Sequence, residues 1–163
     1  LVIASHLDSS IQMRSVVLRH WNMKRRSIFF FSDSRSPKIK ELEKNNNCSI
    51  LFYSRKKNIQ LRFSCHSHVH KTSRLHNYFY SSLSENQKKM YQLKMDPSKQ
   101  LDRTNSNVIV QDYNHVDTGK NYFSVVVCNF NQLEFLELKH KKSIRVKFSW
   151  DKKNNLSAYN IGI

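Results

Sequence analysis

Apolar and polar residues alternate with a period of two through most of this chain, and this alternation restricts the possible folds more than any other feature. It is typical of strands with one face buried and one face in water, so it predicts a mostly antiparallel β-protein. Short polar segments separate neighbouring runs, as hairpin turns require. The predicted strands cover residues 1–7, 11–20, 26–32, 48–54, 58–70, 121–130, 132–138, 142–149 and 155–160.

Two stretches have helical patterns instead. The first runs from Pro37 to about Lys44, because Ser36 is a suitable N-cap and proline suits the first helical position. The second covers residues 72–93, where apolar residues recur at helical spacing, with a break expected near Ser84. Helices are therefore a minor part of the predicted structure.

A sheet of many short strands must protect its edges, which favours a closed or nearly closed β-barrel. The predicted fold class is β-rich α+β, mostly antiparallel, with two or three helices. A chain of 163 residues with 39% hydrophobic content supports one buried core, so we expect a single domain over residues 1–163. The polar segment 94–120 contains Pro97 and Gly119 and is predicted to be a long loop.

Composition excludes several classes of protein. The only glycines are Gly119 and Gly162, so neither a glycine-rich dinucleotide loop nor a P-loop can be present. No signal peptide or membrane-spanning apolar run is found, and we expect a soluble, cytoplasmic protein. The cysteines Cys48, Cys65 and Cys128 are odd in number and lie in strand-like runs, which favours reduced thiols in the core.

The net charge of +16 raises the expectation of an anionic partner, such as nucleic acid, a phosphate ester or a membrane surface. The cations are spread through every segment, however, whereas a nucleic-acid footprint concentrates on one face. A non-enzymatic, basic nucleic-acid-binding β-barrel stays open as an alternative. It would use exposed aromatic residues such as Tyr53 and Tyr80 as stacking platforms.

The start of the first predicted helix is a candidate anion site. A helix N-terminus offers unpaired N–H groups and a partial positive charge, and Ser32, Ser34 and Ser36 add hydroxyl groups around it. Lys38 in the first turn costs about 0.3 to 1 kcal/mol unless an anion lies between it and the helix end. The pattern indicates either a bound phosphate or a capped helix with a solvated lysine.

Arg14 and Arg19 lie on opposite faces of one predicted strand, so they cannot both bind one phosphate without a bulge. We expect them to have separate roles. An arginine in the middle of an apolar strand is costly unless its guanidinium is paired or binds an anion. This cost favours Arg14 as a ligand-binding residue.

Gln60 and Arg62 share the polar face of another predicted strand, and a glutamine amide can read the edge of a heterocycle because it both donates and accepts. His66, His68 and His70 follow on that face, and such a pattern can hold zinc. No carboxylate lies nearby, so exposed imidazoles without a metal are the preferred interpretation. No nucleophile motif is present, and the catalytic residues stay unknown.

Taken in order, 14-RSVVLR-19, 29-FFFSDSRSPKIKEL-42 and 50-ILFYSRKKNIQLRFSCHSHVH-70 resemble the FMN-binding split barrel of the pyridoxamine 5'-phosphate oxidase family. The likeness is closest to a branch of oxidase-like proteins that carry an RTVVLR strand, a TDxRSPK turn and a VQLR strand. The segments 121-NYFSVVVCNFNQLEFLEL-138 and 142-KSIRVKF-148 resemble the final strands of that branch. The likeness covers nearly the whole chain, although the family's usual initial helix has no counterpart before Leu1.

The resemblance implies an FMN site in a homodimer, with the flavin at the subunit interface. Arg14, Ser36 and Lys38 would bind the FMN phosphate, and the backbone of residues 14–19 would lie along the flavin. Gln60 would bond to the isoalloxazine edge. The implied cofactor-binding residues are Arg14, Ser15, Val16, Val17, Leu18, Arg19, Phe31, Ser32, Ser36, Lys38, Gln60 and, from the second subunit, Arg145 or Lys147.

The substrate contacts depart from those of the true oxidases. There, a tyrosine followed four residues later by an arginine grips the substrate phosphate; Tyr78 fits the first position, but Ser82 occupies the second. Arg19 replaces a substrate-contacting lysine, so the implied substrate-binding residues are Arg19 and Tyr78. The resemblance thus implies an FMN-dependent oxidoreductase acting on a small molecule, with pyridoxamine 5'-phosphate oxidase as the narrower hypothesis.

Overall fold

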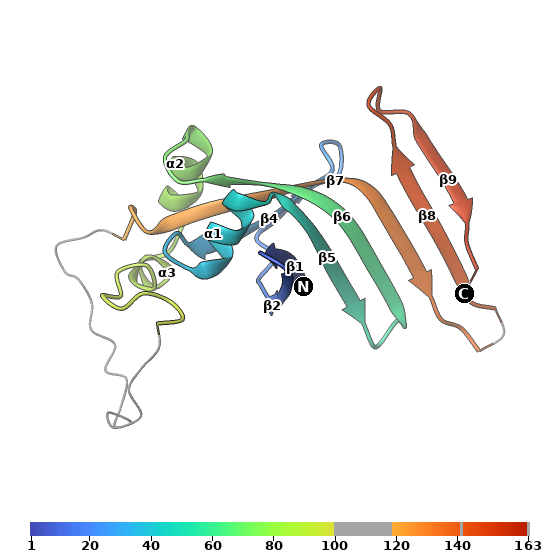
Figure 1. Ribbon diagram of the computed structural model, residues 1–163, viewed down its shortest axis with the longest axis horizontal. Coiled ribbons are helices and arrows are strands. Elements are labelled where there is room, and N and C mark those ends of the chain that lie inside the picture. Colours follow the sequence, from blue (N-terminus) through green and yellow to red (C-terminus); the bar gives the residue numbers. More distant parts are fainter. Residues whose placement is uncertain (100–118, 141, 163) are drawn as a thin grey trace.

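The computed structural model describes residues 1–99, 119–140 and 142–162, so most of the expected 94–120 loop lies outside the described residues. Within those residues, nine strands form one antiparallel sheet, accompanied by three helices (Figure 1). The strands are β1 (Val2–Leu7), β2 (Ser10–Ser15), β3 (His20–Asn22), β4 (Ser27–Asp33), β5 (Asn47–Ser54), β6 (Ile59–His70), β7 (Phe123–Glu137), β8 (Ile144–Trp150) and β9 (Leu156–Asn160). The helices are α1 (Pro37–Lys44), α2 (Arg74–Ser81) and α3 (Glu85–Lys89).

The barrel is closed by the segment that joins β2 to β3. The order β2-β1-β5-β6-β7-β4-β3 puts these two strands at opposite ends of the sheet, although they are neighbours in the sequence. The N–H of Val16 donates to the carbonyl of Leu1 at 3.0 Å, and the N–H of Arg19 donates to the carbonyl of Phe29 at 2.9 Å. The prediction of one strand over 11–20 is therefore wrong. After β2 the chain stops pairing with β1 and crosses to β4.

β7 is one continuous strand where two were expected. Its register against β6 shifts once: Cys65 lies opposite Phe130 and Ser64 lies opposite Gln132, which leaves Asn131 as an extra residue. A bulge of this kind bends a strand without ending it. The first part of β7 pairs with β4 in the barrel, and the last part pairs with β8 in an outer hairpin (Figure 1).

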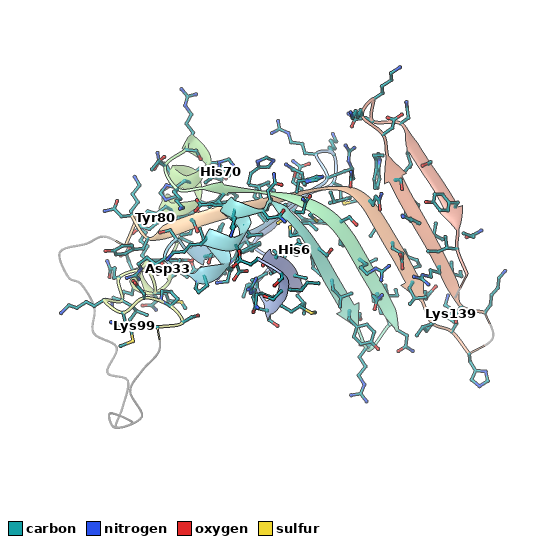
Figure 2. All side chains as sticks on the ribbon, viewed as in Figure 1. His6, Asp33, His70, Tyr80, Lys99 and Lys139 are labelled. Carbon is teal, nitrogen blue, oxygen red and sulfur yellow. The ribbon has the colours of Figure 1, made fainter. Side chains whose placement is uncertain are left out.

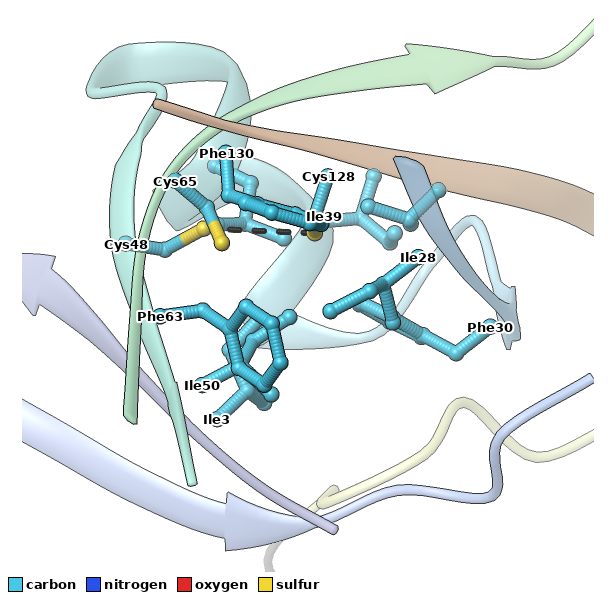
Figure 3. Packing of buried hydrophobic residues seen from close by; sticks show 12 residues of the cluster. Ile3, Ile28, Phe30, Ile39, Cys48, Ile50, Phe63, Cys65, Cys128 and Phe130 are labelled. Atoms are coloured by element: carbon cyan, nitrogen blue, oxygen red, sulfur yellow. Dashed lines mark hydrogen bonds between the residues drawn. The ribbon is translucent and has the colours of Figure 1, made fainter. Parts of the chain in front are cut away.

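β4 is buried on both faces, which explains its unbroken apolar run. Ile28 and Phe30 face the barrel core, whereas Phe29 packs on the other face with Tyr80 of α2 and Leu83. The barrel core consists of Ile3, Ile28, Phe30, Ile39, Leu42, Cys48, Ile50, Phe63, Cys65, Val126, Cys128 and Phe130 (Figure 3).

Both predicted helical regions are confirmed, and so is the break in the second. α1 covers the expected residues. The stretch predicted over 72–93 is divided between α2 and α3, because Ser82 ends the first helix and Ser84 caps the second through a capping box with Gln87. Among the described residues, no helix combines the length and the apolar character needed to cross a membrane.

Candidate functional site

A cavity of about 760 Å³ lies between the barrel and the chain that follows α2. Its barrel wall is formed by the segment that joins β2 to β3 (residues 16–19, the crossing segment), the end of β4 and the start of α1. Its outer wall is formed by side chains between Leu83 and Lys99. Figure 2 shows Asp33 and Lys99, which line the cavity from these two sides. The predicted cofactor-binding residues in the barrel wall are Ser15, Val16, Val17, Arg19, Phe31, Ser32 and Lys38.

Lys38 turns its side chain back toward hydroxyl groups at the start of α1. Its Nζ lies 3.2 Å from Ser32 Oγ and 3.3 Å from Ser36 Oγ, and these two hydroxyls are 3.1 Å apart. Ser36 is the N-cap, yet its side chain makes no capping hydrogen bond, and the first turn contains no acidic residue. The helix end is therefore surrounded by donors and by positive charge.

The ammonium of Lys38 is strained electrostatically. Burial, followed by the positive charge of Arg14, lowers the pKa of Lys38 from its usual value, and the carboxylates of Asp33 and Glu41 oppose this effect only in part. A nearby anion favours the charged form of a lysine and raises its pKa. The position of Lys38 is therefore one where an added anion would be stabilising.

Arg14 is held by a buried carboxylate. Its guanidinium donates to Ser5 Oγ and to both oxygens of Glu41, with NH2 at 3.0 Å from Oε1 and 2.8 Å from Oε2. Ser5 also donates to Glu41 at 2.5 Å, so β1, β2 and α1 meet in one network. A guanidinium has five N–H donors, and this network fixes its direction while leaving capacity for a further acceptor.

Arg19 lies apart from this network, because β2 ends at Ser15 and the chain has crossed to β4 by Arg19. Its guanidinium carbon is 5.5 Å from the centre of the Phe31 ring, and both residues line the cavity. Arg14 and Arg19 therefore have different partners: the first contacts a carboxylate, and the second an aromatic face. The prediction of separate roles is consistent with this arrangement.

The outer wall was not predicted from the sequence, because residues 90–93 were assigned to a helix face. Instead, α3 ends at Lys89 and the following residues line the cavity with long apolar side chains, including Met90, Leu93 and Met95. Tyr91 adds a phenol to this wall. Burial raises the pKa of Tyr91 to about 12, with a smaller raising effect from Asp33 and a lowering effect from Arg19, so the phenol is a hydrogen-bond donor at neutral pH.

Arg35 fastens the outer wall to the barrel. Its guanidinium pairs with Asp33 at 2.7 Å and with Asp96 at 3.2 Å, and it stacks on the Tyr122 ring at 3.9 Å. Arg35 belongs to the motif 29-FFFSDSRSPKIKEL-42, but its partner Asp96 is 61 residues further along the chain. No local pattern in the sequence indicated that contact.

Several predicted site residues do not line this cavity within the described chain, including Arg14 and the buried Ser36. Leu18 faces a separate apolar cavity of about 250 Å³, together with Trp21 and Met23. Gln60 lies opposite Tyr53 and Leu136, in the part of β6 that pairs with the end of β7. The role of Gln60 in cofactor binding therefore stays a prediction, for a site that includes a second chain.

The predicted contributions from β8 and α2 are also separate from this cavity in one chain. Arg145 pairs with Glu134 at 2.7 Å, and Lys147 lines another cavity beside β6 and β7. Tyr78 is 67% exposed and contacts the ring of Phe79. The substrate role of Tyr78 and the interface role of Arg145 and Lys147 stay predictions.

The histidine stripe on β6 has no metal-binding arrangement. His70 lies 3.2 Å from Ser73 Oγ, and its pKa is lowered by burial and by the neighbouring His68. In the parts of the chain that the structure describes, no group of three or more His, Cys, Asp or Glu side chains is arranged to hold a metal ion.

Comparisons with known proteins agree with this geometry. The sequence profile described as "Pyridoxamine 5'-phosphate oxidase, FMN-binding domain" matches residues 4–71. A pyridoxamine 5'-phosphate oxidase-related, FMN-binding protein from Nostoc punctiforme has a similar structure, with a TM-score of 0.79, 16% identity, and coverage of 99% of this chain and 86% of that chain. Among curated proteins, no sequence matches this chain.

A second similar structure is PhzG from Burkholderia lata, solved in complex with tetrahydrophenazine-1-carboxylic acid. Its TM-score is 0.78 at 16% identity, with coverage of 99% of this chain and 81% of that chain. The General Stress Protein 26 from Bacillus anthracis is more distant, with a TM-score of 0.52, 17% identity, and coverage of 84% and 87%. At these identities the similarity shows the fold.

The fold is therefore the FMN-binding split barrel, closed by the crossing segment that lines the cavity. Residues 4–71, which contain most of the barrel wall, match the FMN-binding domain of the pyridoxamine 5'-phosphate oxidase family, and the resemblance seen in the motifs is confirmed. These findings favour a flavin-binding protein over the nucleic-acid-binding alternative.

Proposed function

We propose that this protein is an FMN-dependent oxidoreductase whose cofactor phosphate is bound at the start of α1 by Arg14, Ser36 and Lys38, with Ser32 beside them. The observation that carries the proposal is that Lys38 and Ser32 line one end of a large cavity, with the Ser36 hydroxyl in contact with both and Arg14 close enough to lower the pKa of Lys38. A phosphate is the chemical group that fits this donor set, because it accepts several hydrogen bonds and carries the missing negative charge.

FMN binding offsets the electrostatic cost of the site. Lys38 lies in the first turn of α1, where the helix dipole opposes a positive charge, and its pKa is already lowered by burial and by Arg14. A phosphate dianion interacts favourably with both cations and with the helix N-terminus. We therefore expect the pKa of Lys38 to rise when FMN binds.

The flavin ring is proposed to lie along the crossing segment, beside Phe31. When bound, FMN would supply the hydride or electron transfer. The chain itself positions the cofactor, keeps water from part of the cavity with the apolar side chains of the outer wall, and offers Arg19 and the protonated phenol of Tyr91 as donors to a bound molecule. Arg19 is the substrate-binding candidate with direct access to the cavity.

The outer wall favours a substrate without a gripped phosphate. Ser82, at the position of the oxidases' arginine, donates its hydroxyl to the carbonyl of Phe79 within its own helix. Met90, Leu93 and Met95 present apolar surface to the cavity instead. We propose a small apolar or aromatic substrate that stacks on the flavin, rather than a phosphorylated vitamer.

A homodimer is proposed because two surfaces of the chain expose large apolar side chains, which a second copy would bury. Both faces of β9 are exposed, with Leu156 57% and Tyr159 47% accessible. Trp21 is 61% exposed beside the apolar cavity that Leu18 lines. A second copy packed there would bring its outer hairpin, with Arg145 and Lys147, to the first copy.

The buried free cysteines fit a cytoplasmic location.

The test is the absorption spectrum of the purified protein and its titration with FMN. We expect flavin absorbance in the wild type and a weakening of FMN binding by about 10- to 100-fold in Lys38→Met, since a hydrogen bond to a charged group contributes about 1.5 to 3 kcal/mol. Lys40→Met is the matched control, because Lys40 is an exposed lysine on the same helix. Wild-type protein that stays colourless with excess FMN would rule the proposal out.

Substrate chemistry is tested separately on the flavin-loaded protein. Formation of pyridoxal phosphate from either phosphorylated vitamer under oxygen would support the narrower hypothesis of pyridoxamine 5'-phosphate oxidase activity. Reduction of the bound flavin by a non-phosphorylated aromatic compound, without turnover of the vitamers, is the outcome that we expect.

A further inference from the structure

Three cysteine thiols meet in the barrel core, although they are far apart in the sequence. Cys48 on β5 lies directly opposite Cys65 on β6, and both side chains face the core. The Sγ of Cys128 on β7 lies 3.9 Å from the Sγ of Cys48. Figure 3 shows the sulfur atoms of Cys48 and Cys65 beside each other, with the contact to Cys128 drawn as a dashed line.

Sheet geometry determines which two of these thiols can form a bond. Directly opposed residues of an antiparallel pair have Cα atoms about 4.5 to 5.5 Å apart, and a disulfide needs about 4.4 to 6.8 Å. Cys48 and Cys65 meet this condition. Cys128 is two strands away from Cys48, about 9 to 10 Å at the usual strand spacing, so its contact with Cys48 cannot become a bond without movement of the sheet.

The three thiols are not equivalent. Contacts with the sulfur atoms of Cys128 and then Cys65 lower the pKa of Cys48 against the opposing effect of burial. Contact with Cys48 and burial raise the pKa values of Cys65 and Cys128. Cys48 is thus the thiol whose pKa is lowered, and thiolates are the nucleophilic form of cysteine.

Two of the three cysteines line a cavity that a small polar reagent can enter. A cavity of about 260 Å³, separate from the candidate flavin site, is lined by Cys48 and Cys65. Asn47, His66 and Asn131 also line it, so its surroundings are partly polar. Cys128 does not line this cavity and is fully buried.

We propose that Cys48 and Cys65 form a peroxide-reactive dithiol. The Cys48 thiolate attacks the O–O bond of a peroxide, ROOH, giving a sulfenic acid on Cys48 and an alcohol, or water when the peroxide is H2O2. The Cys65 thiol then attacks the sulfenic sulfur; an S–S bond forms, the S–O bond breaks and one water leaves. Overall, the two thiols lose two protons and two electrons, and the peroxide is reduced to ROH and water. Cys128 contacts Cys48 and stays reduced.

The reaction does not depend on the proposed flavin chemistry. The new bond would join two strands that are already paired, so the barrel stays closed and the barrel wall keeps its position. We therefore expect the oxidised protein to bind FMN as the reduced protein does.

The test treats the folded wild-type chain with hydrogen peroxide, removes the excess with catalase, and then unfolds and alkylates the protein. Peptide mass spectrometry should find the number of alkylated thiols reduced from three to one, a linked peptide pair containing Cys48 and Cys65, and alkylated Cys128. The urea-unfolded chain, treated identically, shows the dose at which freely accessible thiols are oxidised. Three alkylated thiols in the folded protein at that dose would overturn the proposal.

Two variants assign the roles of the individual thiols. Cys128→Ala should still form the linkage between Cys48 and Cys65, whereas Cys65→Ala should leave a sulfenic acid on Cys48 that dimedone traps. A linkage that includes Cys128 in the wild type, or dimedone labelling on Cys128 in place of Cys48, would contradict the assignment. The wild-type measurement stands by itself if either variant fails to fold.

Discussion

The two walls of the cavity are both fastened by an arginine and a carboxylate, but they are built in different ways. Arg14 and Glu41 hold the barrel wall, with 22% and 2% of their side chains exposed. Arg35 holds the outer wall by bridging the mostly buried Asp33 and Asp96, whose side chain is 61% exposed. The barrel wall is therefore fixed inside a hydrogen-bonded sheet, and the outer wall depends on one partly solvated contact.

This difference fits two separate functions, cofactor binding at the barrel wall and substrate contact at the outer wall. The barrel wall contains the residues proposed to bind the cofactor, and its position follows from strand pairing on both sides of the crossing segment. The outer wall, proposed to face the substrate, follows a five-residue helix and has little regular structure. Rigid elements suit the placement of a cofactor, whereas a loosely held wall can change with little cost to the fold.

The largest effect is expected from Arg14→Met, which leaves the Glu41 carboxylate buried without its cation. We expect the free energy of unfolding to fall by about 3 to 5 kcal/mol, measured by urea denaturation of the apoprotein. Arg62→Met is the control, because Arg62 pairs with Glu134 through a side chain that is 53% exposed, and a change within about 1 kcal/mol is expected there. Equal effects of the two substitutions would show that the barrel wall is not held by a buried pair.

A smaller effect is expected from Arg35→Met, which removes both contacts of the outer wall. Asp33 loses its charged partner while Asp96 stays hydrated, so we expect a loss of about 1 to 3 kcal/mol. Limited proteolysis should cut the chain faster between residues 93 and 99, while FMN affinity changes less than in Lys38→Met. Arg25→Met, in an exposed turn, is the control, and unchanged proteolysis in Arg35→Met would contradict the fastening role.

The barrel wall should also make the free energy of unfolding depend on pH, through Lys38. Because the pKa of Lys38 is lowered from 10.5 in the folded apoprotein, the unfolded chain binds more protons between the lowered value and 10.5. Stability must then rise with pH in that window. Relative to Lys38→Met, the wild type should gain up to about 1 kcal/mol as the pH approaches 10.5, judged from the cost of a cation at a helix start. If the difference in stability between the wild type and Lys38→Met fell with pH instead, Lys38 would be stabilised as a cation even without a bound anion.

The smallest effect is expected from Tyr91→Phe in the outer wall. The free energy of unfolding should change by about 1 kcal/mol or less, since only one hydroxyl is removed. In a rapid pH-jump measurement, the variant should lack the ultraviolet absorbance step near pH 12, because the pKa of Tyr91 is raised to about 12. Tyr53→Phe is the control, because it changes an exposed phenol and should keep the absorbance step. If the step disappears in this control, it belongs to Tyr53 and not to Tyr91.

The sequence predicted the barrel wall better than the outer wall, for physical reasons that differ between the two. Ser36 and Pro37 mark a helix start by local capping rules, and the alternation around Arg14 marks a strand, so both could be recognised without the fold. Met90 and Leu93 have helical spacing, but the chain leaves the helix after Lys89, and local periodicity does not report that.

The sequence by itself determined the mostly antiparallel β-class, most of the strands, the helix start at Pro37, the family resemblance and the candidate phosphate-binding residues, because these depend on local periodicity, capping and motif spacing. Only the tertiary structure decided that Arg14 pairs with Glu41, that Arg35 reaches Asp96, and that three cysteines share one part of the core. These contacts join residues distant in the chain, and their geometry is set by strand register and barrel closure. No pattern within a single segment of sequence contains that information.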